Sequence, residues 1–244
     1  MRVTGDPAYV LHHRPWSETS LLLEVYTRHH GRIGLIAKGA RRPRSPARGL
    51  LAPFQPVLIS YSGKGELAVV TGVEPNGLAH ALAGEPLYCG FYLNEMLMRV
   101  TARYDAHERL FDLYHATLAR LATDADISPA LRVFEKHLLS ELGYGLLLDR
   151  DATSKVPIAP DAQYDYIPET GPVPVTGGHV FHGVGVSGAA LLALASENLT
   201  APEHLRAARA VLRACLARHL GDRPLESRRL IREARARVPA AAEN

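Results

Sequence analysis

The strongest chemical signal in the sequence is a run of cations between residues 38 and 48. This segment, KGARRPRSPAR, has no acidic residue, and its basic residues are Lys38, Arg41, Arg42, Arg44 and Arg48. Its two prolines and its glycine favour a loop over a helix. A cationic loop can follow a phosphate backbone, and such binding is independent of base sequence and sensitive to salt. The run therefore predicts a nucleic-acid interface, and the alternative is a solvated loop that binds nothing.

Residues in the neighbouring segments could extend this interface. Arg14, Arg32 and Lys64 could add phosphate contacts if the chain folds them to the same side as the loop. Aromatic side chains could stack on unpaired bases. The candidates for stacking, each of which fits a core or turn position better, are Trp16, Tyr26, Phe54 and Tyr61.

A second basic set lies near the C-terminus. Arg206, Arg209 and Arg213 have the spacing that places them on one face of a helix. Five more arginines follow on a last predicted helix: Arg228, Arg229, Arg232, Arg235 and Arg237. A basic helical face is typical of solvated surface, so these residues are secondary candidates for contact with nucleic acid.

Motifs that would indicate an enzyme are weak. Gly183, Gly185 and Gly188 have the GxGxxG spacing, but a dinucleotide site needs a parallel βαβ unit and only helices follow. The SGKG segment at residues 62–65 lacks the spacing of a P-loop. Adjacent histidines on a strand point to opposite faces and rarely share a metal. We therefore predict no catalytic residues, no metal site and no cofactor.

The residues before position 80 predict a small β-barrel. Five short β-prone runs are separated by turn signals, at residues 8–13, 19–26, 32–37, 57–61 and 66–73. Five strands of this length favour an OB-fold, and an SH3-like barrel is the alternative.

Helical periodicity begins at Glu85 and predicts helices at about residues 85–100, 107–122 and 128–142. Ser128 is the expected N-cap of the third helix, Pro129 its first residue and Gly143 its C-cap. Residues 149–186 interrupt the pattern with prolines, glycines and the β-prone bits YDYI and HVFHGV. Helices then resume at residues 188–197, 202–220 and 224–238. We predict an α+β chain with an OB-fold domain at 1–80 and a helical domain at 81–244, which carries an irregular insertion at about 149–186.

Composition fits a globular protein with an anionic partner. The 244 residues are 47% apolar and 22% charged, which excludes a disordered chain. The sequence shows no transmembrane run and no signal peptide, and two cysteines cannot form a disulfide framework. The net charge of +3 conceals an asymmetry: residues 1–80 and 201–244 each carry ten basic and five acidic residues. The two basic ends enclose an acidic middle.

Several long stretches also match a known pattern, in order and over nearly the whole chain. They are residues 8–27, 31–42, 53–65, 87–97, 131–145 (LRVFEKHLLSELGYG) and 224–230 (PLESRRL). On these residues the chain resembles the RecO family of bacterial DNA repair and recombination mediators. The resemblance implies an N-terminal OB-fold, a helical domain and no catalytic site. The basic loop of the family falls on residues 38–48.

The same resemblance implies functions and partners. It implies binding to single- and double-stranded DNA, annealing of complementary strands and, together with RecR, loading of recombinase onto DNA coated by single-strand-binding protein. We expect a cytoplasmic, nucleoid-associated protein with no membrane contact. The alternative interpretations are a general RNA-binding OB-fold protein, a protein-only adaptor and a dinucleotide-dependent oxidoreductase.

Two further expectations concern the helical domain. The acidic, apolar C-terminal tail of single-strand-binding protein needs an apolar groove with a cation, and Arg132 and Lys136 lie one turn apart beside a leucine-rich face. Many members of the family hold a four-cysteine zinc site after the LGYG segment, but residues 146–187 contain no cysteine. We therefore expect a zinc-free member whose insertion is held by packing alone.

Overall fold

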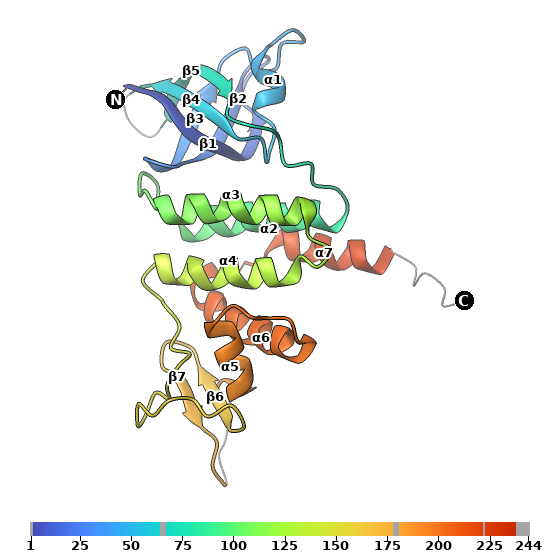
Figure 1. Cartoon of the computed structure of the whole chain (residues 1–244). Coiled ribbons are helices and arrows are strands. Elements are labelled where there is room, and N and C mark those ends of the chain that lie inside the picture. The colour runs from blue at the N-terminus through green and yellow to red at the C-terminus, as the bar shows by residue number, and fades with distance from the viewer. Residues whose placement is uncertain (1, 64–66, 178–180, 222, 238–244) are drawn as a thin grey trace, which may run out of the picture. The chain divides into compact units, whose positions relative to one another are not determined.

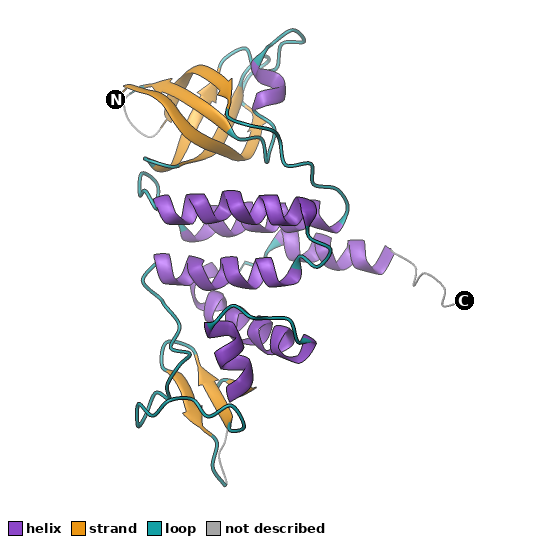
Figure 2. Ribbon diagram, viewed as in Figure 1, coloured by secondary structure: helices purple, strands orange, loops and turns teal. Residues whose placement is uncertain are grey.

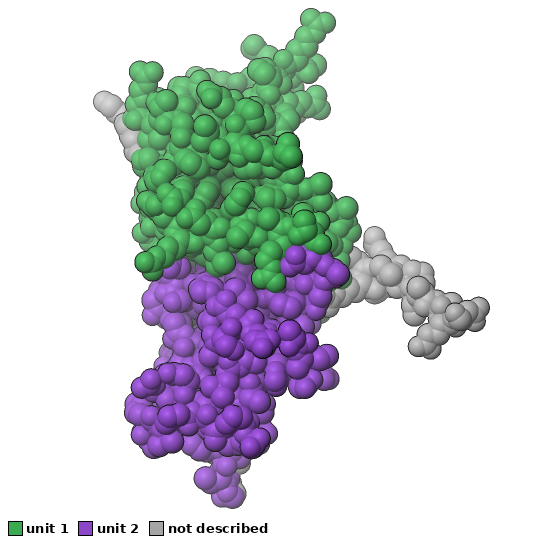
Figure 3. Space-filling view, viewed as in Figure 1, with its two compact units in different colours: residues 1–123, 224–244 green, residues 124–223 purple. Residues whose placement is uncertain are grey.

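The computed structural model describes residues 2–63, 67–177, 181–221 and 223–237, with the side chains of 234–237 left aside (Figure 1). The chain forms two compact units. Unit 1 comprises residues 1–123 together with 224–244, and unit 2 comprises residues 124–223 (Figure 3). Among the described residues, every helix is too short or too polar to cross a membrane.

Unit 1 begins with a closed five-stranded barrel in the order β1-β2-β3-β5-β4, which confirms the predicted OB-like barrel (Figure 2). Only the β3–β5 pair is parallel. Side chains that point inward, such as Val10, Leu23, Leu35 and Ile59, form its buried core. The strands are β1 (Arg2–Pro15), β2 (Leu21–Thr27), β3 (Gly31–Ala37), β4 (Val57–Ser62) and β5 (Leu67–Pro75).

Strand β1 is much longer than the predicted run at residues 8–13. Gly5 and Pro7 suggest a break, but the strand continues through them with a shift of register against β4 between Val3 and Asp6. Irregular pairing of this kind accommodates residues that regular strands disfavour.

The segment between β3 and β4 is not entirely a loop. A short helix, α1 (Ala47–Leu50), includes Arg48, so the expectation of a loop through residue 48 was wrong at its end. Pro46 directly precedes the helix, a position whose N–H takes part in no hydrogen bond of the helix, so proline is tolerated there.

Three helices complete unit 1: α2 (Glu85–Val100), α3 (Glu108–Thr123) and α7 (Glu226–Arg237). The side-chain amide of Asn94 in α2 donates to the Leu11 carbonyl of β1 at 2.9 Å, and Tyr114 of α3 donates to Asn94 Oδ1 at 2.6 Å. All these groups are buried, so they fasten the barrel to both helices. Glu95 of α2 accepts hydrogen bonds from the amides of Glu226 and Ser227 and thereby caps α7.

Unit 2 contains α4 (Ser128–Glu141), α5 (Gly188–Ala195), α6 (Pro202–Leu220) and a three-stranded antiparallel sheet. Helix α4 starts at Ser128 itself and is preceded by Ile127 without a side-chain cap, so the expected Ser128 cap was wrong. Gly143 has a φ of +86°, which confirms the left-handed residue expected after this helix.

The sheet lies within the segment predicted as the insertion. Strand β6 (Gln163–Ile167) contains the predicted YDYI run and pairs with β7 (Gly171–Pro174) and β8 (Val184–Ser187). Of the β-prone run at 179–184 only Val184 is in a strand, and residues 179 and 180 lie outside the described residues.

Buried carboxylates, and not packing alone, hold this insertion together, which corrects the expectation. Asp151 accepts hydrogen bonds from the amides of Thr153, Ser154 and Val156 and from the Ser154 hydroxyl. Asp165, with 0% of its surface exposed, accepts from the amides of His182 and Gly183.

Candidate nucleic-acid interface

The basic loop exposes all of its cations while its backbone is anchored in the barrel. Ala40, within the loop, and Leu51, directly after α1, are both buried in the barrel core. These two apolar residues fix the backbone of the segment, while its charged side chains point to solvent. The five exposed cations are those named from the sequence: Lys38, Arg41, Arg42, Arg44 and Arg48.

Short backbone hydrogen bonds shape the loop between these anchors. The Arg42 amide donates to the Gly39 carbonyl at 3.1 Å, and the Ser45 amide donates to the Arg42 carbonyl at 3.0 Å. Gly39 has a φ of +71°, a left-handed conformation that favours glycine. The arginines are therefore presented from consecutive turns and not from a freely extended chain.

The loop is joined to the turn between β1 and β2. The Arg41 amide donates to the Thr19 carbonyl at 2.9 Å, and Arg41 Nη1 donates to the Ser17 carbonyl at 2.7 Å. Arg14, near the end of β1, and Trp16, at the start of the turn, are both exposed. The register that pairs Leu21 with Ala37 brings the two connections to one end of the barrel, which sequence spacing alone does not reveal.

The other predicted members of the interface are placed differently. Arg32 forms a salt bridge with Glu24 at 3.1 Å and donates to the Thr101 carbonyl, so its charge is engaged within unit 1. Lys64 lies outside the described residues. The three remaining aromatic candidates, Tyr26, Phe54 and Tyr61, are buried.

The C-terminal arginines divide between the two units. Arg206, Arg209 and Arg213 are exposed on one face of α6 in unit 2. In unit 1, the Arg228 guanidinium lies over the Tyr92 ring at 5.5 Å, and Arg229 forms salt bridges with Glu226 and Glu233. Helix α7 thus engages two of its cations internally.

The two cations predicted to hold the partner tail are also engaged. Arg132 is 9% exposed and pairs with Glu135 at 2.7 Å, while its Nε has no hydrogen-bond partner among the described residues. Lys136 Nζ contacts Glu197 and the Ala195 carbonyl, each at 2.8 Å. Burial raises the pKa of Glu197, but hydrogen bonds from Lys136 and His137 outweigh this and leave it below its ordinary value.

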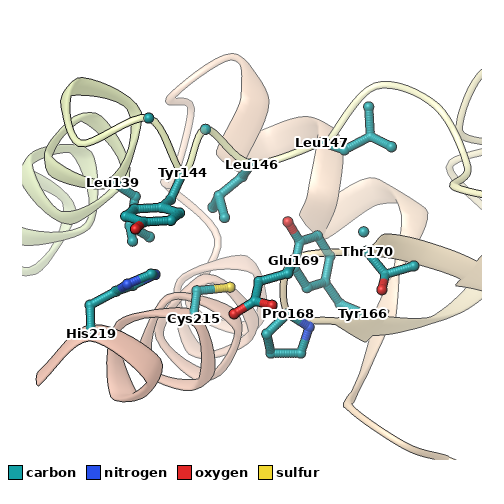
Figure 4. A pocket seen from close by; sticks show the side chains of 13 residues that line it. Leu139, Tyr144, Leu146, Leu147, Tyr166, Pro168, Glu169, Thr170, Cys215 and His219 are labelled. Carbon is teal, nitrogen blue, oxygen red and sulfur yellow. The ribbon is translucent and has the colours of Figure 1, made fainter. Parts of the chain in front are cut away.

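A pocket in unit 2 was not foreseen from the sequence. It lies between the end of α4, the β6–β7 turn and α6, and Figure 4 shows the ring of Tyr144, one of its lining residues, facing His219. Burial raises the pKa of the Cys215 thiol to about 11, so this cysteine is protonated at neutral pH. Glu169 lines the pocket and no described lining residue is an arginine or lysine, so an acidic peptide would meet a like charge there.

The weak motifs have structural explanations. A Cβ at Gly183 would lie 2.1 Å from the Tyr166 carbonyl oxygen, and one at Gly188 would lie 1.9 Å from that of Ala159. Gly183 directly precedes β8 and Gly188 begins α5, so these glycines allow close approach of two backbone segments and do not belong to a dinucleotide fold.

The histidine pair at residues 29 and 30 does share a partner, contrary to the strand argument. Both rings contact the carboxylate of buried Asp6, at 2.8 and 2.6 Å, because they occupy the β2–β3 turn and not a strand. Even so, the described part of the chain has no group of three or more His, Cys, Asp or Glu side chains arranged so that it could hold a metal ion.

Comparison with known proteins covers both parts of this architecture. Residues 1–78 match the family model for the N-terminal part of recombination protein O, and residues 82–229 match the model for its C-terminal part. The chain is 46% identical to the DNA repair protein RecO of Aromatoleum aromaticum, over 95% of this chain and 96% of that protein. It is 49% identical to the DNA repair protein RecO of Alkalilimnicola ehrlichii, over 99% and 95% of the respective chains. With a barrel of the expected topology, two matching family models and near full-length identity of this order, the chain belongs to the RecO family.

Proposed function

We propose that this protein binds DNA as a recombination mediator in DNA repair and that it acts without catalysis. One observation carries the proposal: an anchored loop exposes five cations at one end of an OB-like barrel. Family membership supports DNA as the partner, since the relatives are named DNA repair proteins. The RNA-binding alternative has no such support.

Phosphate neutralisation explains how such a loop would promote annealing of complementary strands. Two single strands repel each other through their phosphates, and cations held between them weaken that repulsion. A loop that reads no base edge accepts any sequence, which annealing requires. Its five cations lie on one connected segment, so they can act on the same stretch of backbone.

The test is a salt titration of binding to fluorescently labelled single-stranded DNA, followed by anisotropy. If about five phosphates are neutralised, log K falls with log salt at a slope of roughly −3.5. Charge reversal of Arg41, Arg42 and Arg44 to glutamate should weaken binding of every sequence alike and flatten the slope. The absence of a slope together with the absence of any effect of the triple variant would refute the proposal.

The matched control is the reversal of Arg206, Arg209 and Arg213 on α6, which changes the net charge equally in unit 2. An effect confined to the loop variant supports the loop as the main interface. An equal effect of both variants would make the α6 face a second DNA contact. Competition with single-stranded RNA of the same sequence separates DNA binding from general nucleic-acid binding.

We propose further that the protein loads recombinase together with RecR and meets the tail of single-strand-binding protein at α4. Support comes from the buried Arg132, whose Nε has no hydrogen-bond partner among the described residues and whose pairing with Glu135 can be exchanged for a tail carboxylate. Annealing of DNA coated by single-strand-binding protein, with intact or tail-deleted partner, tests this contact. The Arg132→Ala variant should lose the dependence on the tail, and Lys136→Ala tests whether the second predicted cation takes part.

A further inference from the structure

Trp16 differs from the other aromatic side chains of the barrel. Tyr9, Tyr26, Phe54 and Tyr61 are buried, whereas Trp16 exposes 50% of its surface. Tryptophan is mostly buried in folded proteins because its apolar area is large. An exposed indole is therefore an informative exception, and a ligand with a flat apolar face would fit it.

The turn that carries Trp16 is held on two sides. The Trp16 amide donates to the Ser20 carbonyl at 3.1 Å and closes the turn. Arg41 donates from its side chain to the Ser17 carbonyl and from its amide to the Thr19 carbonyl. Because the backbone is already ordered, less conformational entropy is lost when the indole meets a ligand.

The surroundings of the indole indicate what that ligand is. Arg14 lies two residues before it, and Arg41 links its turn to the other cations of the loop. An aromatic face beside a row of cations fits a nucleotide strand, whose phosphates meet the charges and whose bases meet the ring. The loop between the first two strands is also one of those that OB-folds use for oligonucleotides.

We propose that the Trp16 indole stacks on an unpaired base and so gives the interface a preference for single-stranded over double-stranded DNA. The inference rests on the proposed function and concerns the same site. Bases within a duplex already stack on their neighbours, so their faces are closed to a protein side chain. The loop cations contact phosphates in either form, whereas the indole distinguishes the two.

The sequence offers a direct probe, because Trp16 is its single tryptophan. Excitation at wavelengths where tyrosine does not absorb reports on this indole alone. In the wild-type protein, single-stranded DNA should quench the emission and reach saturation at the same concentration as anisotropy does. A duplex of the same sequence should bind without comparable quenching.

Substitution supplies a second readout. Trp16→Ala should weaken binding of single strands by roughly 5- to 150-fold, the loss of one stacked base, and leave duplex binding nearly unchanged. Trp16→Phe should retain most of the affinity, since it keeps an aromatic face. Tyr104→Ala is the matched control, because Tyr104 is exposed to a similar extent. Its neighbour Arg103 forms a β-bridge with Arg32, which lies at the opposite end of β3 from the basic loop.

The possible results distinguish a failure of the Trp16 inference from a failure of the proposed function. Binding of single strands with unchanged emission and with equal affinity of Trp16→Ala would overturn the inference and leave the proposed function intact. An equal loss for single strands and duplex would also overturn it, because the indole would then not distinguish them. If the wild-type protein binds no DNA in the anisotropy experiment, the proposed function and the inference fail together.

Discussion

The basic loop at residues 38–48 and the insertion at residues 149–186 are both rich in proline and glycine, and neither has a long helix or strand among its described residues. They differ in the burial of their charged side chains. The loop exposes its cations and buries only apolar anchors. The insertion buries the carboxylates of Asp151 and Asp165 and surrounds them with amide donors. A charge kept in water remains available to a partner, whereas a buried charge must be satisfied by the protein itself.

This difference has a consequence for mutagenesis. Charges of the loop should affect DNA binding without affecting stability, and charges of the insertion should do the reverse.

The largest effect is expected at the centre of the insertion. Asp165→Ala should lower the free energy of unfolding of unit 2 by about 3 kcal/mol, because two hydrogen bonds to a buried charged acceptor are lost. Denaturant titration measures the loss. Asp161→Ala is the control, since Asp161 is exposed, and it should stay within about 0.5 kcal/mol of the wild type. A stable Asp165→Ala protein would break the contrast.

Single substitutions in the loop should have a smaller effect, and only on binding. Arg42→Ala and Arg44→Ala should each reduce the magnitude of the salt slope by about 0.7 and weaken single-strand binding by roughly fivefold or more. Their unfolding free energies should match the wild type within about 0.5 kcal/mol, because both side chains are exposed. Arg42→Lys keeps the charge and should keep the slope. A loop variant that unfolds at a lower denaturant concentration than the wild type would contradict the expectation that loop charges affect binding only.

A local effect of pH is expected at Asp151. Hydrogen bonds from the Ser154 hydroxyl and neighbouring amides lower the pKa of this carboxyl below its ordinary value. A lowered pKa means that the carboxylate stabilises its turn above about pH 4, and that this stabilisation is lost as the pH falls through the folded-state pKa. The amide shifts of Thr153 and Ser154 should report the transition in an NMR titration. They should show none in Asp151→Asn, and a wild-type transition above the ordinary value would contradict the assignment.

The smallest effect is expected at the exposed pair between Arg218 of α6 and Glu169 of the β6–β7 turn, whose atoms lie 2.8 Å apart. Arg218→Gln should change stability by less than about 1 kcal/mol, as is usual for exposed pairs, and should leave the salt slope of DNA binding unchanged. Thermal melting and anisotropy measure both. A clear loss of DNA affinity would show that the DNA path extends to this part of unit 2.

The sequence predicted the elements that periodicity determines. The barrel strands β2 and β3 follow from β-prone runs between turn signals, and α2, α4 and α6 follow from helical spacing; the structure confirms these elements. Element ends were less accurate. At Ser128 the amide donates to the side chain of Asp126 and the helix already includes Ser128, whereas the extent of β1 depends on its pairing with β4, far along the chain. The boundary at residue 80 between a barrel domain and a helical domain stays a prediction.

The charged residues of the candidate interface could be predicted from the sequence, but the residues that contact them in the fold could not. A run without acids stays exposed in the structure, so Arg42 and Arg44 were identified by composition alone. Arg32 has the same charge, but a contact with Glu24 on the adjacent strand engages it, and no local spacing reveals that pairing. The exposure of Trp16 and the link from Arg41 to its turn likewise depend on strand register.

The capping of α7 by Glu95 bears on the order in which the chain is completed during synthesis. Residues 224–237 belong to the same compact unit as residues 1–123, with the whole of unit 2 between them in the sequence. The barrel, α2 and α3 are therefore synthesised well before α7, the helix that packs on α2. Until unit 2 has been synthesised, the Glu95 carboxylate lacks the amide donors of Glu226 and Ser227. A nascent chain arrested before residue 224 holds a barrel with its loop in place but an uncovered face on α2.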